Sequence, residues 1–101
     1  MTKNFRTYQL AKAFYHECEH LKFKAPMKDQ FERALLSVVL NLAEGSGKLT
    51  SKDRRHFFSI AMGSLREVQA LLDLTQNQIQ LDHSDPLAAS LYRLIQNPGG
   101  V

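Results

Sequence analysis

The chain has 101 residues, of which 44% are hydrophobic and 23% are charged, and its formal net charge is +3. This length suits one domain with a single core, and the composition excludes an intrinsically disordered chain. No apolar run reaches the roughly 18–20 residues needed to span a bilayer, and the N-terminus lacks the apolar core of a signal peptide. A single cysteine, Cys18, excludes an internal disulfide framework and favours a reducing, cytoplasmic environment.

The positive charge is unevenly distributed along the chain. Residues 1–60 contain eleven Lys or Arg against six acidic residues, whereas residues 61–101 contain two against four. A basic half favours a polyanionic partner such as nucleic acid. A solvated surface explains an excess of this size equally well.

Hydrophobic periodicity is helical along nearly the whole chain, and no segment alternates as a strand does. Within a single domain over residues 1–101 we expect four helices, at about residues 4–22, 26–43, 51–77 and 85–97. The first helix gathers its apolar side chains on one side, among them Phe14 and Cys18. A polar loop is expected between Asn77 and Ser84.

The second expected helix is unusually apolar. Leu36 and Leu40 extend its apolar stripe so far that little of the circumference is left for water, which predicts burial by several neighbours, including other subunits. Gly45 is expected to end this helix in the left-handed conformation. Thr50 and Asp53 suit the start of the third helix.

Small and polar residues interrupt the apolar faces of the second and third helices at helical offsets. They are Gln30, Arg33, Ser37, Asn41 and Glu44 on the second helix, and Ala61, Gly63, Ser64 and Glu67 on the third. We interpret them as devices for close helix contact that satisfy one another by hydrogen bonds, with Arg33 neutralising a carboxylate across the contact. The alternative is acid–base chemistry by Glu44 and Glu67.

Short connections between successive helices favour antiparallel neighbours. The expected fold is therefore all-α, an up-down-up-down four-helix bundle with a short fourth helix. Because the fourth helix cannot cover the second and third along their full length, either part of the core is exposed or a neighbouring chain covers it.

Residues 16–20 read His-Glu-Cys-Glu-His, which matches the zinc-protease pattern H-E-x-x-H. His16 and His20 could hold a metal from one helix face, with Glu17 activating its bound water. Both histidines, however, lie opposite the apolar stripe. A catalytic site also needs a third ligand and a cleft, for which a bundle of about 100 residues offers little room. A solvated helix face is favoured, and we expect no metal, no cofactor and no catalytic residue.

Lys48, Lys52, Arg54 and Arg55 form the densest basic cluster of the chain. Such clusters contact phosphates without sequence selectivity, which makes these four residues the candidate nucleic-acid-binding site. A soluble loop is the alternative. The adjoining GSGKLT segment differs from a phosphate-binding loop because Leu49 follows the lysine and a helix precedes the segment, so a simple turn is favoured.

The segment NLAEGSG, followed by a helix carrying AMGSLREV, resembles the bacterial 23S rRNA-intervening sequence protein family of four-helix bundles. The resemblance covers about residues 5–75 and rests on Gln30, Arg33, Ala34, Ser37, Asn41, Leu42, Ala43, Glu44, Gly45, Phe57, Ala61, Gly63, Ser64 and Glu67. It implies a helical subunit without established enzymatic activity that assembles into a ring, commonly a homopentamer. It also implies distant kinship to the accessory protein of diversity-generating retroelements, which binds nucleic acid and a reverse transcriptase.

Two hypotheses of function follow. The first is a non-enzymatic, oligomeric helical protein that binds nucleic acid, in the first place RNA, through basic surface residues. Five copies of a chain with net charge +3 would carry +15 and repeat the basic cluster around a ring. The alternative is a protein-interaction adaptor whose charge serves only solubility. A hydrolase centred on His16, Glu17 and His20 is the least favoured reading.

Overall fold

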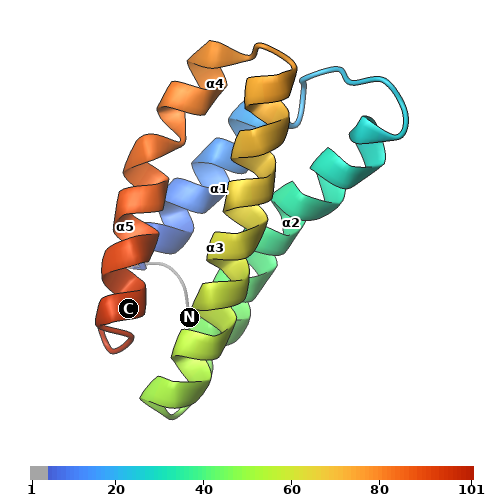
Figure 1. Cartoon of the computed structure of the whole chain (residues 1–101). Coiled ribbons are helices and arrows are strands. Elements are labelled where there is room, and N and C mark those ends of the chain that lie inside the picture. Colours follow the sequence, from blue (N-terminus) through green and yellow to red (C-terminus); the bar gives the residue numbers. More distant parts are fainter. Residues whose placement is uncertain (1–4) are drawn as a thin grey trace.

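Five helices form between residues 5 and 101, the part of the chain that this computed structural model describes (Figure 1). They are α1 (Arg6–Cys18), α2 (Met27–Ser46), α3 (Ser51–Leu74), α4 (Gln78–His83) and α5 (Asp85–Gln96). No strand is present in residues 5–101. The prediction of an all-α fold is confirmed.

The two longest helices, α2 and α3, form an antiparallel pair that packs along most of its length. α1 packs against α2 and α5, and α5 packs against α3. The chain therefore forms an antiparallel bundle of four arms, of which α1, α2 and α3 are the first three (Figure 1). The fourth arm is α4 followed by α5, with only Ser84 between them. No helix within residues 5–101 is long and apolar enough to cross a membrane.

The core consists of aromatic and branched side chains that every arm contributes. Phe14 of α1, Phe31 of α2, Phe58 and Leu65 of α3, and Leu91 of α5 are all buried. The spacing of these residues follows the helical period, which explains why the apolar faces in the sequence predict the core correctly.

The predicted end of the second helix is wrong. α2 continues through Gly45 to Ser46, and no glycine within residues 5–101 has a positive φ. Gly45 serves a different purpose, since an added Cβ would lie 2.6 Å from Cε1 of Phe58 and 3.1 Å from Cβ of Phe57. The glycine therefore allows α3 to approach α2 closely, and its conformational freedom is not used.

The left-handed residue of this fold lies instead at the end of α3. Gln76 has φ 61°, the Asn77 N–H donates to the Leu72 carbonyl at 2.9 Å, and the Gln76 N–H donates to the Asp73 carbonyl at 3.1 Å. These two bonds form a Schellman motif. The motif ends α3 at Leu74, three residues before the predicted end.

Two further boundaries differ from the prediction. α1 ends at Cys18 and not near residue 22, because the following chain turns to place the Phe23 ring 4.3 Å from that of Phe31. The expected polar loop before residue 85 contains α4. Ser84, which is fully buried, joins α4 to the bundle by accepting a hydrogen bond from Gln69 of α3 and donating one to the Leu81 carbonyl.

Candidate nucleic-acid interface

The polar side chains between α2 and α3 form one small hydrogen-bonded group. The hydroxyls of Ser37 and Ser64 lie 2.7 Å apart, and the Asn41 amide donates to the Ser37 hydroxyl and carbonyl at 3.0 and 2.9 Å. All three residues are half-buried. Neutral hydrogen bonds of this kind contribute about 1 kcal/mol each to stability. The arrangement joins two helices and exposes no activated nucleophile.

The two carboxylates considered for catalysis lie far apart. Glu44 and Glu67 fall on opposite sides of the serine pair because the helices are antiparallel, and the helical rise puts them about 15 Å apart along the axis. Carboxylates that act as a catalytic pair lie from about 3 Å apart, where they share a proton, to about 9.5 Å apart, as in glycosidases. Glu44 instead lies 3.1 Å from the ammonium group of Lys48. The structure therefore does not bring Glu44 and Glu67 together.

The remaining motif residues of these helices differ in burial. Ala61 is fully buried, whereas Gln30, Arg33 and Gly63 are exposed. The ion pair expected of Arg33 does not form with any residue in 5–101. An added Cβ at Gly63 would meet no described atom within 4 Å. The expected close backbone approach is thus absent at Gly63 within the described part of the chain.

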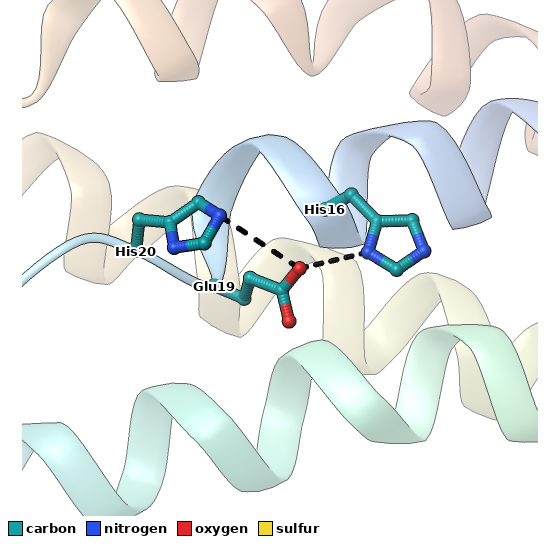
Figure 2. A network of polar contacts seen from close by, with 3 residues as sticks. All are labelled: His16, Glu19 and His20. Atoms are coloured by element: carbon teal, nitrogen blue, oxygen red, sulfur yellow. Dashed lines mark hydrogen bonds and ion pairs between the residues drawn. The ribbon is translucent and has the colours of Figure 1, made fainter.

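The histidine motif does not form a catalytic constellation. His20 lies beyond the end of α1, and Figure 2 shows it reaching with His16 toward a single carboxylate oxygen of Glu19, at 3.9 and 2.8 Å. Glu17, the residue that would activate water, instead contacts Nδ1 of His83 at 2.6 Å. Within residues 5–101 no group of three or more His, Cys, Asp or Glu side chains could hold a metal ion. The residues of this motif therefore make polar contacts at the surface.

Cys18 is buried on the core side of α1. Burial, and to a smaller extent the neighbouring Glu17, raises the pKa of the Cys18 thiol from 9.0 to about 12. The side chain is therefore a neutral thiol at physiological pH, which suits packing and not nucleophilic chemistry.

The four residues of the predicted basic cluster surround the turn between α2 and α3. Arg54 donates to the carbonyls of Lys48 and Pro98 at 2.8 and 3.3 Å, and Arg55 donates to the Ile95 carbonyl at 3.1 Å. Carbonyl partners orient a guanidinium without cancelling its charge, and each arginine keeps unused N–H donors. Lys52 is exposed and forms no hydrogen bond or ion pair with another residue in 5–101.

Lys48 is the most restrained member of this cluster. Its ammonium group pairs with Glu44 and lies 5.0 Å from the centroid of the Phe57 ring. Lys52 and Arg55 therefore present the most accessible positive charge at this turn.

The charges of the whole bundle are separated along its long axis. We call the end where α1 and α3 begin and α2 and α5 finish the basic end (Figure 1). Within five residues of these helix ends, and in the turn and tail beside them, the charged residues are Arg6, Lys48, Lys52, Arg54, Arg55 and Arg93 against Glu44 and Asp53. By the same measure the opposite end carries Lys22, Lys24 and Lys28 against Glu17, Glu19, Asp29, Glu32, Asp73, Asp82 and Asp85. Such a separation gives the basic end a positive field.

Arg6 and Arg93 are the members of the basic end that sequence reasoning missed. They are separated by most of the chain, and only the packing of α1 against α5 brings their helix ends together. No local pattern signals this proximity. Only the order in which the helices pack could have revealed that Arg6 and Arg93 lie close together.

The outer face of α2 carries an apolar stripe that the helices of residues 5–101 leave partly exposed. Leu36 and Leu40 are 44% and 55% exposed, and the partly exposed Val39 lies beside them. Ile60 of α3 is also exposed, at 39%. One or two exposed leucines are ordinary, but neighbouring apolar side chains grouped on one helix face favour an interaction surface.

Comparison with known proteins identifies one family. The sequence profile of the 23S rRNA-intervening sequence proteins matches residues 3–96, which is nearly the whole chain. No curated protein and no solved structure matches the chain. The match includes the serine contact, the α2–α3 turn and the basic end described above. This chain therefore belongs to the 23S rRNA-intervening sequence protein family.

Proposed function

We propose that this chain is a non-enzymatic helical subunit that assembles into a ring of identical copies, five by its resemblance, and binds RNA at the basic end. The observation that carries this proposal is the separation of charge along the bundle, with six basic side chains against two acidic ones at one end. RNA phosphates attract such a surface over a distance comparable with the Debye length, about 8–10 Å in physiological salt.

Assembly strengthens this binding for a physical reason. Each added copy repeats the basic end, so that several weak phosphate contacts act on one RNA strand at a high effective concentration. The exposed apolar stripe on α2 supports assembly, because a second copy would remove Leu36 and Leu40 from water. A closed ring would place the basic ends of all copies on one side.

The RNA interface is tested by neutralising the basic end. A Lys52→Gln/Arg55→Gln variant is expected to bind a generic single-stranded RNA about tenfold more weakly than the wild type in fluorescence anisotropy, with a shallower dependence of affinity on salt. Wild-type affinity is expected to fall more than about tenfold between 50 and 200 mM salt. The loss should not depend on RNA sequence, because contacts to phosphates carry no sequence information.

The matched control is Lys22→Gln/Lys24→Gln, which removes the same charge from the opposite end. This control should bind RNA almost as the wild type does. An equal loss in both variants would show that net charge alone matters, and an affinity independent of salt would contradict the proposal.

A protein-interaction adaptor is the second candidate, and the same apolar stripe favours it. In that case the stripe accepts a different protein, and the basic end serves solubility. Capture of a defined protein that survives nuclease treatment and requires Leu36 and Leu40 would favour the adaptor over the RNA-binding ring.

A further inference from the structure

A polar hollow opens at the basic end, between the start of α1, the end of α5 and the C-terminal tail. Its volume is about 240 Å³. The lining includes Arg6 and Thr7 of α1, Ser90 and Arg93 of α5, and Asn97 and Gly100 of the tail. The three segments come from the two ends of the sequence and meet where α1 packs against α5.

The charge of this hollow is entirely positive. Arg6 and Arg93 line it, no acidic residue does, and both arginines are exposed. Within residues 5–101, neither guanidinium takes part in an ion pair. This distinguishes them from Arg54 and Arg55, each of which is held by a backbone carbonyl. Two guanidiniums without an internal acceptor favour an external anion.

The buried side of the hollow supplies further donors. The hydroxyls of Thr7 and Ser90 lie 2.7 Å apart, and these residues are only 5% and 6% exposed. Two hydroxyls carry two O–H donors, and the bond between them uses one, which leaves one donor for a ligand. Phe5, the residue that precedes α1, offers no side-chain acceptor to the first turn of the helix. The buried side of the hollow therefore offers a hydroxyl donor beside the two guanidinium groups.

We propose that the hollow between Arg6 and Arg93 binds a terminal phosphate group. Such a group carries about −1.5 to −2 charge at pH 7, against −1 for an internal phosphodiester. Two arginines match the larger charge, and each can donate two parallel hydrogen bonds to phosphate oxygens. An RNA with a 5′-phosphate and a phosphorylated small molecule present the same chemistry. The choice of RNA as the molecule that carries this phosphate rests on the function proposed above.

The test compares two RNA oligonucleotides of one sequence, labelled at the 3′ end and carrying either a 5′-phosphate or a 5′-hydroxyl. The wild-type chain is expected to bind the phosphorylated RNA about tenfold more tightly. An Arg6→Gln/Arg93→Gln variant should lose this preference. Lys22→Gln/Lys24→Gln removes equal charge elsewhere and should keep it. Inorganic phosphate, titrated by calorimetry against the same three proteins, reports on the hollow without RNA.

The outcomes separate this inference from the proposed function. A preference for the 5′-phosphate that is lost only in the arginine variant supports the terminal-phosphate site. Equal binding of both RNAs, without heat from inorganic phosphate, overturns the site and leaves RNA binding at the basic end intact. Binding of inorganic phosphate that requires both arginines, without RNA binding, supports the site and overturns the proposed function. Both substitutions are at exposed positions, and circular dichroism checks that the helices remain.

Discussion

A Gly45→Leu substitution is expected to lower the free energy of unfolding by about 3 kcal/mol. The first side-chain carbon alone would lie 2.6 and 2.9 Å from two ring atoms of Phe58. That ring is fully buried and itself packs against Phe5, with centroids 6.1 Å apart, so it has little room to move. Relief of the clash requires α3 to move away from α2. Thermal and urea unfolding followed by circular dichroism measure the loss.

The chain offers a matched control, because Gly63 is also a helical glycine. Its added Cβ would meet no described atom within 4 Å. Gly63→Ala is therefore expected to leave stability unchanged or to raise it by up to about 1 kcal/mol through helix propensity. If Gly45→Leu unfolds at the same urea concentration as the wild type, α2 and α3 do not approach each other closely at Gly45.

A Leu36→Lys/Leu40→Lys variant is expected to remain helical and to dissociate into single chains. Both side chains are about half exposed within one chain, so the substitution costs the subunit little. Two buried ammonium groups in each copy would oppose the contact between subunits. Light scattering coupled to size exclusion should give a mass near 11.5 kDa. RNA affinity should fall as well, because the basic ends are no longer joined.

The control for this variant changes two other exposed leucines. Leu49 and Leu74 are 97% and 74% exposed and lie at the α2–α3 turn and the end of α3, away from the α2 stripe. Leu49→Lys/Leu74→Lys should keep the wild-type mass. If the Leu36 and Leu40 substitutions also leave the mass unchanged, the stripe is not the contact between subunits.

Much of the fold could be predicted from sequence because burial follows the helical period. The inward positions of all four arms, such as Phe31, Leu65 and Leu91, are read from spacing alone. The helix ends were less predictable. Glycine is the residue type expected at a helix terminus, but the role of Gly45 depends on the ring of Phe58 in another helix. The left-handed position falls to Gln76, a residue with no local preference for it.

The candidate site was only partly accessible to sequence reasoning. The cluster from Lys48 to Arg55 is visible because its members are neighbours in the sequence. The contribution of Arg6 and Arg93 is not, since it arises from the topology that sets α1 beside α5. The H-E-x-x-H match failed for a local reason. α1 ends before His20, and Glu17 is engaged by His83 from α4.

The most direct test is the molar mass of the wild-type protein in solution, measured by light scattering in low salt with and without a single-stranded RNA. We predict a mass several times the 11.5 kDa of one chain, close to fivefold, and a further increase when RNA is added. A mass of one chain that RNA leaves unchanged would contradict the account.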